Sequence, residues 1–174
     1  MENGIDPQKL VAIQPWYGYD YKCAGRPVSD FCIIQKDSSV SLNANATKAK
    51  TKVSKFPFVL PDYDVNTDPS QASITFGAIC NLLRNHTRKW NNVTMTPYLT
   101  YKRSTGDYHE VCYDDAESIK LKSDYVFSMN LRGIGVWTVD FADYQNFPKE
   151  SAGIWEGLTF GLDKKLTLER AMND

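Results

Sequence analysis

Two short apolar runs that lie far apart in the chain constrain the fold most strongly. The first covers residues 10–16 and follows a turn that contains Pro7, and the second covers residues 134–139. A strand that is apolar along most of its length is typical of a parallel sheet that is covered on both faces. The two runs therefore predict an α/β chain in which two core strands pair in parallel.

Helix signals lie between the two runs. Apolar residues at helical spacing predict a helix over residues 71–90. Asp114 and Glu117 form a pattern similar to a capping box, which predicts a second helix over residues 115–130. Gly133 is expected to close that helix, because glycine is common just beyond a helix end.

A hairpin and a third helix complete the pattern. Residues 96–102 and 108–113 are rich in strand-forming residues and flank a turn that contains a glycine, which predicts a β-hairpin. Pro148 predicts the start of a final helix that runs to about residue 162. The charged residues 163–174 are expected to fray as a tail. The predicted order is strand, helix, hairpin, helix, strand, helix.

Composition and charge limit the domain organisation and the partners. Residues 1–162 are predicted to belong to one domain, in which residues 36–70 form a polar, variable loop. The 174 residues include 20 Lys plus Arg and 21 Asp plus Glu, so a net charge of -1 gives no field that gathers nucleic acid or anionic membrane. No apolar run approaches the roughly 18 residues of a membrane helix. We expect neither nucleic acid nor membrane as a partner.

The cysteines and histidines give no support to a metal site. The cysteines form no C-x-x-C pair, and the two histidines are His86 and His109. We therefore expect no metal and no other cofactor. The four cysteines are Cys23, Cys32, Cys80 and Cys112.

Three acceptor triplets for N-glycosylation point to the secretory route. They begin at Asn45, Asn85 and Asn92. Three such triplets together with an even number of cysteines favour an oxidising compartment. The first ten residues contain no apolar segment typical of a signal peptide. The simplest resolution is that residue 1 is not the natural start of the mature domain.

Two longer segments carry a chemical signal. The first has the sequence GIDPQKLV followed by PWYGYDYKC, and the second has YDDAESIKLK followed by LRGIGVW. They resemble the last two strands and an adjoining helix of family 18 glycoside hydrolases, and are most similar to its chitobiase branch. The resemblance covers roughly residues 4–35 and 75–162. It implies the C-terminal part of a (β/α)8 TIM barrel, with the seventh and eighth strands and an inserted β-hairpin, incomplete as a barrel.

The resemblance implies three residues that bind the substrate. Trp137 would form the floor of the subsite for the reactive N-acetylglucosamine, because an indole face stacks on the C–H groups of a pyranose. Tyr17 would contact N-acetyl or hydroxyl groups of the sugar. Tyr19 stands where most members have an arginine, which favours a site for short substrates that acts from a chain end. Structural packing remains the alternative for Trp137 and Tyr17, and Asp140 and Asp143 are expected to cap the following loop.

The substrate, the compartment and one disulfide follow from the same resemblance. The substrate would be a chito-oligosaccharide or the chitobiose core of an N-glycan, and the protein would be lysosomal or secreted. The spacing of Cys23 and Cys32 is similar to that of a disulfide in the chitobiase branch, which implies that they pair. Pairing of Cys80 with Cys112 stays open, because the resemblance supplies neither cysteine.

The catalytic motif of the family is absent from this sequence. Family 18 enzymes carry D-G-x-x-D-x-D-x-E, in which the final Glu is the general acid and the N-acetyl group of the substrate is the nucleophile. Asp62 and Asp64 form an Asp-x-Asp core, but Asn66 stands where the acid belongs. We therefore expect no catalytic residue in this chain. None of the six glutamates lies in the motif: Glu2, Glu110, Glu117, Glu150, Glu156 and Glu169.

Two functional hypotheses remain. In the first, the chain is the sugar-binding portion of a chitobiase-like glycosidase, inactive alone, and its partner is the missing N-terminal segment of the barrel. In the second, it is a catalytically inactive remnant that binds chito-oligosaccharides or a protein partner. A cysteine-dependent or metal enzyme has little support, because no set of His, Cys and Asp residues suggests one.

Overall fold

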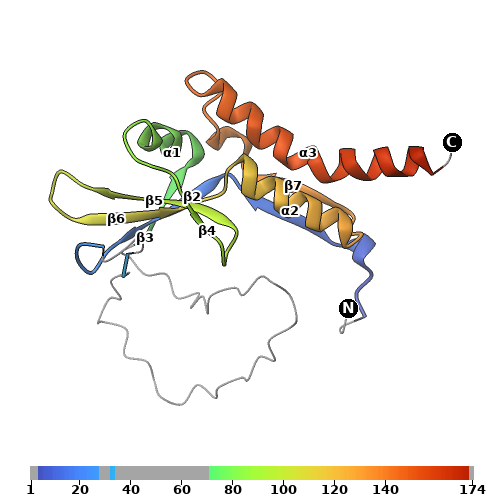
Figure 1. Cartoon of the computed structure of the whole chain (residues 1–174), viewed down its shortest axis with the longest axis horizontal. Coiled ribbons are helices and arrows are strands. Elements are labelled where there is room, and N and C mark those ends of the chain that lie inside the picture. The colour runs from blue at the N-terminus through green and yellow to red at the C-terminus, as the bar shows by residue number, and fades with distance from the viewer. Residues whose placement is uncertain (1–3, 28–31, 34–70, 173–174) are drawn as a thin grey trace, which may run out of the picture.

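A computed structural model describes residues 4–27, 32–33 and 71–172 of the chain. The predicted loop over residues 36–70, Asn45 and the Asp62 to Asn66 segment lie outside the described residues. The described part contains a two-stranded parallel sheet, a five-stranded antiparallel sheet and three α-helices (Figure 1). No helix in these ranges is both long and apolar enough to span a membrane.

The two apolar runs form the parallel pair that the sequence predicts. Strand β1 (Val11–Pro15) and strand β7 (Gly133–Trp137) are parallel, and Pro15 pairs with Trp137. A short 3-10 helix, Pro7–Lys9, precedes β1. A second one, Val139–Phe141, follows β7, so the strand ends two residues earlier than predicted.

Helices α2 (Ala116–Ser128) and α3 (Pro148–Ala171) pack together and cover one face of this pair (Figure 1). Ile134 and Val136 of β7 pack against the core beneath them. Buried apolar side chains from both helices and from the end of β1 fill this core: Trp16, Ile119, Ile154 and Leu158.

The boundaries of α2 correct the sequence prediction at both ends. The capping box joins Asp115 to Ser118, not Asp114 to Glu117, because the Asp114 carboxylate instead accepts two hydrogen bonds from Lys122, at 2.7 and 2.6 Å. At the other end, the helix stops at Ser128 and Asn130 takes a positive φ of 54°. Gly133 therefore begins β7 and does not close the helix.

The predicted charged tail is wrong for most of its length. Helix α3 continues to Ala171, well beyond the expected end at residue 162. Just beyond residue 162, the Lys164 ammonium lies 2.7 Å from the Asp124 carboxylate, an exposed ion pair that joins α3 to α2.

The remaining strands form one antiparallel sheet in the order β3-β2-β6-β5-β4. The predicted hairpin is confirmed as β5 (Thr96–Lys102) and β6 (Tyr108–Cys112). Gly106 in its turn has a φ of +96°, which an L side chain adopts only with strain. Strand β2 (Tyr17–Lys22), which the sequence analysis did not predict, pairs with both β6 and β3.

The predicted helix over residues 71–90 is wrong in its extent. Residues Gln71–Thr75 form β3, Phe76–Leu83 form α1, and Lys89–Asn91 form β4. The hydroxyl of Thr75 accepts a hydrogen bond from the N–H of Ala78 and so begins the helix there. The preceding residues pair with β2, an interaction that local spacing cannot reveal.

The face of the parallel pair that lies opposite the helices exposes apolar side chains. Val11 and Ile13 are 51% and 57% exposed. In the described residues each strand of the pair has one neighbour, so no closed barrel forms. The two core strands are therefore covered on one face here, and not on both as predicted.

We predict that the isolated chain self-associates and binds apolar dyes, because this face and both sheet edges lack a cover in the described part of the chain. Analytical ultracentrifugation and dye fluorescence measure both effects. A sharp, cooperative unfolding transition of a monomer that binds no dye would contradict this expectation.

Helices α2 and α3 approach closely along a row of glycines. A Cβ added at Gly157 would lie 2.7 Å from the carbonyl oxygen of Ala116, and one at Gly161 would collide with the Ser123 backbone. The space is used by polar contacts, since the Ser123 hydroxyl donates to Leu158 O and accepts from the Gly161 N–H. The glycines are therefore required by packing.

We predict that Gly157→Ala destabilises the chain by about 1–3 kcal/mol, because a backbone carbonyl cannot yield to the added methyl group. Gly153→Ala is the matched control, since its Cβ would meet the Ala116 side chain at 3.3 Å, and alanine raises helix propensity by roughly 1 kcal/mol. Urea unfolding of both variants measures the difference. Equal stability of the two would refute the packing argument.

Candidate functional site

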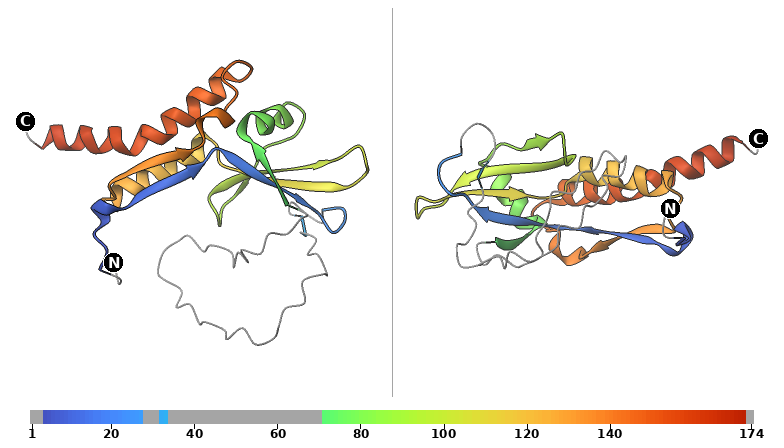
Figure 2. Two further views of the ribbon diagram at one scale, coloured as in Figure 1. Left: turned by 180° about the vertical axis from the view of Figure 1, so that it is seen from behind. Right: turned by 90° about the horizontal axis from the view of Figure 1, so that it is seen from below.

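The candidate site lies at the carboxyl end of the parallel pair. Trp137 ends β7, and its carbonyl accepts a hydrogen bond of 2.9 Å from the N–H of Trp16, the residue that joins β1 to β2. The Trp137 side chain is 67% exposed, whereas Trp16 is buried in the core. The peptide bond between Trp137 and Thr138 is cis. Because β1 leads directly into β2, the antiparallel sheet extends from this same end (Figure 2).

An aromatic row begins at this end and follows β2. The rings of Tyr17 and Tyr19 are 5.5 Å apart and nearly perpendicular, and the ring of Tyr21 lies 6.2 Å beyond Tyr19. Phe141 lies 6.1 Å from Tyr17 on the other side. These alternate residues of β2 share one face of the sheet. The structure thus brings Tyr17 and Tyr19, both of which the sequence analysis names as sugar contacts, next to each other on one face of β2.

Trp137 lies at the same end without joining that row. Among the described residues, no ring contact connects Trp137 to either tyrosine. Tyr21 and Phe141 belong to the row and were missed by the sequence analysis. The period-two alternation Tyr17-x-Tyr19-x-Tyr21 is the signal that could have identified both the strand and its aromatic face.

The other face of β2 packs tightly under α1. A Cβ at Gly18 would lie 2.6 Å from the carbonyl oxygen of Cys112 and 2.9 Å from Ile79 of α1. Glycine is therefore needed where β2 crosses the end of β6. This close approach fixes the strand that carries the aromatic row.

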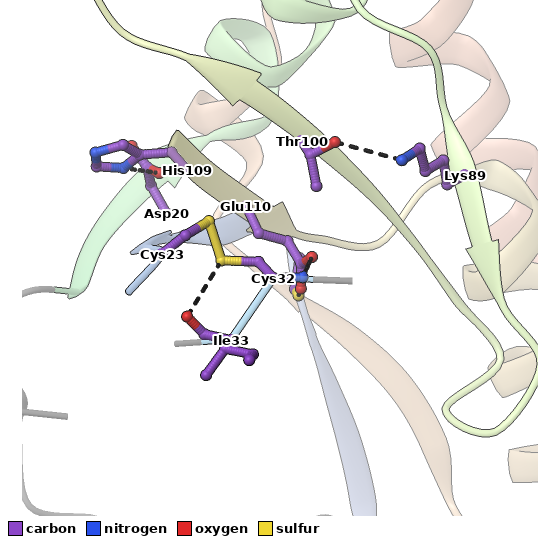
Figure 3. The surroundings of a disulfide bond; sticks show 9 residues. Asp20, Cys23, Cys32, Ile33, Lys89, Thr100, His109 and Glu110 are labelled. Atoms are coloured by element: carbon purple, nitrogen blue, oxygen red, sulfur yellow. Dashed lines mark hydrogen bonds and ion pairs between the residues drawn. A yellow bond between two sulfur atoms is a disulfide. The ribbon is translucent and has the colours of Figure 1, made fainter. Parts of the chain in front are cut away.

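Cys23 and Cys32 form a disulfide with a Cα–Cα distance of 5.4 Å, as the resemblance implies (Figure 3). The N–H of Cys32 donates a hydrogen bond of 3.0 Å to the buried carboxylate of Glu110 on β6. Burial raises the pKa of Glu110 above its ordinary value, although this hydrogen bond opposes the shift. The disulfide loop thus packs against the sheet on the side of the aromatic row.

Cys80 and Cys112 are free thiols, so the pairing that the sequence left open is not present. Burial is the main cause that raises the pKa of each thiol to about 12. The carboxylate of Glu110, which accepts a hydrogen bond from Cys112, raises the pKa of that thiol further. Neither thiol is suited to act as a nucleophile at neutral pH.

We predict that non-reducing peptide mapping of the native protein finds Cys23 linked to Cys32. Cys80 and Cys112 should be alkylated at pH 8 only after unfolding, because a thiol pKa of about 12 lowers the thiolate fraction by about a thousandfold relative to a free thiol. Alkylated Cys23 in the native protein would contradict the first expectation. Rapid native labelling of Cys112 would contradict the second.

The two aspartates beyond Trp137 organise the following loop, as expected of capping residues. Asp140 accepts a hydrogen bond of 2.7 Å from the Thr138 hydroxyl. Asp143 accepts from the backbone and side-chain amides of Asn146, and these bonds lower the pKa of its carboxyl. Both carboxylates are thus engaged within their own loop.

The remaining predicted site residues lie on turns. Asn85 and Asn92 are exposed, the first after α1 and the second after β4. In the ranges that the structure describes, no three His, Cys, Asp or Glu side chains gather closely enough to hold a metal ion.

Comparison with known proteins identifies the family. Residues 1–142 match the sequence profile of glycosyl hydrolases family 18. The chain belongs to this family. It is 33% identical over 143 residues to di-N-acetylchitobiase of Mus musculus, which covers 82% of this chain and 34% of the mouse protein. The chain thus spans about a third of the length of the family 18 relatives it matches.

Solved structures of the family share the fold over the same fraction. A Group IV chitinase of Ostrinia furnacalis, in complex with allosamidin, aligns with a TM-score of 0.64 at 20% identity, over 94% of this chain and 37% of that protein. Human YKL-39, described as a pseudo-chitinase with retained chitooligosaccharide binding properties, aligns with a TM-score of 0.60 at 18% identity, over 93% and 37%. The α/β arrangement is therefore that of part of a family 18 structure.

Proposed function

We propose that this chain forms the sugar-binding side of a family 18 active site for oligosaccharides of N-acetylglucosamine. The observation that carries the proposal is the position of Trp137, whose side chain is largely exposed at the carboxyl end of a parallel strand. Ligands of parallel α/β barrels bind at this end. An exposed indole there offers a flat apolar surface for the C–H face of a sugar ring.

The neighbouring aromatic row supports the same substrate class. Tyr17 follows β1 at the same end as Trp137, and Tyr19 continues the row along β2. Tyrosine combines an apolar ring with a hydroxyl, which suits the alternating C–H and O–H surface of a sugar. N-acetylchitobiose, from a chito-oligosaccharide or from an N-glycan core, is the proposed ligand.

Hydrolysis would require a general acid from outside this sequence. A positioned proton donor alone is typically worth 10²- to 10⁴-fold in rate. We propose that the rest of the barrel supplies it and also covers the apolar face of β1 and β7. The alternative, a protein that binds sugar without cleaving it, is the property that the name of human YKL-39 describes for that relative. Sequencing the transcript upstream of Met1 separates the two: an in-frame D-G-x-x-D-x-D-x-E supports the enzyme.

The compartment is a proposal of the same kind. A disulfide and two exposed acceptor asparagines, Asn85 and Asn92, support a lysosomal or secreted protein.

We predict that Trp137→Ala weakens binding of N-acetylchitobiose about thirtyfold, because removing the indole forfeits about 2 kcal/mol of apolar contact. Trp137→Phe should retain most of the affinity, since it keeps a flat ring. Leu168→Ala is the matched control, because this exposed apolar residue lies near the C-terminal end of α3, away from the loop that follows Trp137. Isothermal titration calorimetry of the whole chain measures all four proteins.

Unchanged affinity in Trp137→Ala would overturn the proposed site. The same samples should show no hydrolysis of N-acetylchitobiose or of longer oligosaccharides, which chromatography of the products measures. Turnover by the purified chain that a single Glu→Gln change abolishes would show that the acid lies within this sequence.

A further inference from the structure

A buried carboxylate lies directly beneath the aromatic row. Asp20 occupies the position between Tyr19 and Tyr21 on β2, and its side chain is 5% exposed. It accepts hydrogen bonds from the Tyr101 hydroxyl at 2.7 Å and from the Arg103 guanidinium at 2.9 Å. A carboxylate only accepts, so Nδ1 of His109, 2.8 Å away, donates the third (Figure 3).

These three bonds connect three neighbouring strands. Asp20 lies on β2, His109 on β6, and Tyr101 on β5, two strands away and roughly 10 Å across the sheet. Arg103 follows β5 at the start of the hairpin turn. One side chain therefore fixes the relative position of β2, β6 and β5 on the side that α1 covers.

Stability alone does not account for such a group. Burying a carboxylate carries a desolvation penalty, and replacing buried charged groups by packed apolar residues is often neutral or stabilising. What a fully bonded carboxylate supplies is a defined geometry, because its three donors hold it from different directions. Here, the carboxylate holds in place the backbone of β2 between Tyr19 and Tyr21.

The two faces of β2 are coupled by the pleat of the strand. Asp20 pairs with Val111 and Tyr19 with Cys112, so consecutive side chains point to opposite faces. A shift of residue 20 toward or away from β6 therefore moves the Tyr19 ring with it. The 5.5 Å contact between Tyr19 and Tyr17 would change with such a shift.

We propose that Asp20 is a positioning residue that sets the Tyr19 ring for contact with the sugar. The inference rests on the proposed function, because it needs Tyr19 to contact an oligosaccharide. Asp20 itself does not touch the ligand and acts through Tyr19 from the opposite face of the sheet.

A double-mutant cycle on the whole chain tests this role. The variants are Tyr19→Ala, Asp20→Asn and the two combined, and the probe is tetra-N-acetylchitotetraose. Asp20→Asn keeps the size of the side chain, but its amide nitrogen must then face one of three donors. Asp107→Asn is the matched control, since it removes one charge from an exposed ion pair with Lys22 at the same end of the sheet.

We expect Tyr19→Ala to weaken binding about two- to tenfold, and Asp20→Asn to reproduce part of that loss. In the Tyr19→Ala background, Asp20→Asn should have no further effect, because its target is already gone. Asp107→Asn should leave affinity unchanged. Thermal unfolding of every variant corrects the concentration of folded protein.

Additive losses from Asp20→Asn and Tyr19→Ala would overturn the inference while leaving the sugar site in place, because a merely structural role acts independently of Tyr19. No loss from Tyr19→Ala would overturn the inference together with the proposed role of Tyr19. If Asp20→Asn does not fold, Arg103→Gln removes one donor from a half-exposed side chain and must show the same coupling.

Discussion

The parallel pairing of β1 with β7 is the interaction on which the rest of the structure depends. It joins residues 11–15 to residues 133–137, so that the segments between them must leave and return at fixed ends of the two strands. Because the strands are parallel, their carboxyl ends coincide. The hydrogen bond from Trp16 to Trp137 extends the pairing by one residue. It brings the exposed indole and the start of the aromatic row to one edge.

The antiparallel sheet is connected to that pair directly, because β1 continues into β2 with one residue between them. β1 passes into β2 at Trp16, whose ring is buried with Phe76 and Phe147 beneath α1 and α3. On the far side, Arg88 forms ion pairs with Asp115 and Glu117 at the start of α2. The sheet is thus held to the parallel pair both through the chain and through side chains. These connections fix the position of the aromatic row relative to the carboxyl end of β7.

Sequence patterns predicted the elements that depend on local chemistry. The apolar runs identified the parallel pair, and the glycine turn identified the β5–β6 hairpin, because each signal is contained within its own segment. β3 was missed because residues 71–75 become a strand only by pairing with β2, fifty or more positions away in the sequence. The predicted roles of Trp137 and Tyr17 came from the resemblance to a family and not from local patterns. The bonds of Asp20 could not be predicted, since Tyr101, Arg103 and His109 meet it only after three strands align.

The close approach at Gly18 limits how this region can diverge. A Cβ at this position would meet both the Cys112 carbonyl oxygen and the Ile79 side chain, so any side chain here would push β2 away from β6 and α1. Tyr17, Tyr19 and Tyr21 carry the aromatic row on one face of the strand, while Gly18 and Asp20 make the close contacts and hydrogen bonds on the other face. The ring-bearing face of β2 can therefore be altered without disturbing the contacts that hold the strand to β6 and α1. Substitutions of Gly18 or Asp20 on the opposite face would instead disrupt the packing or the hydrogen bonds that hold β2 in the sheet.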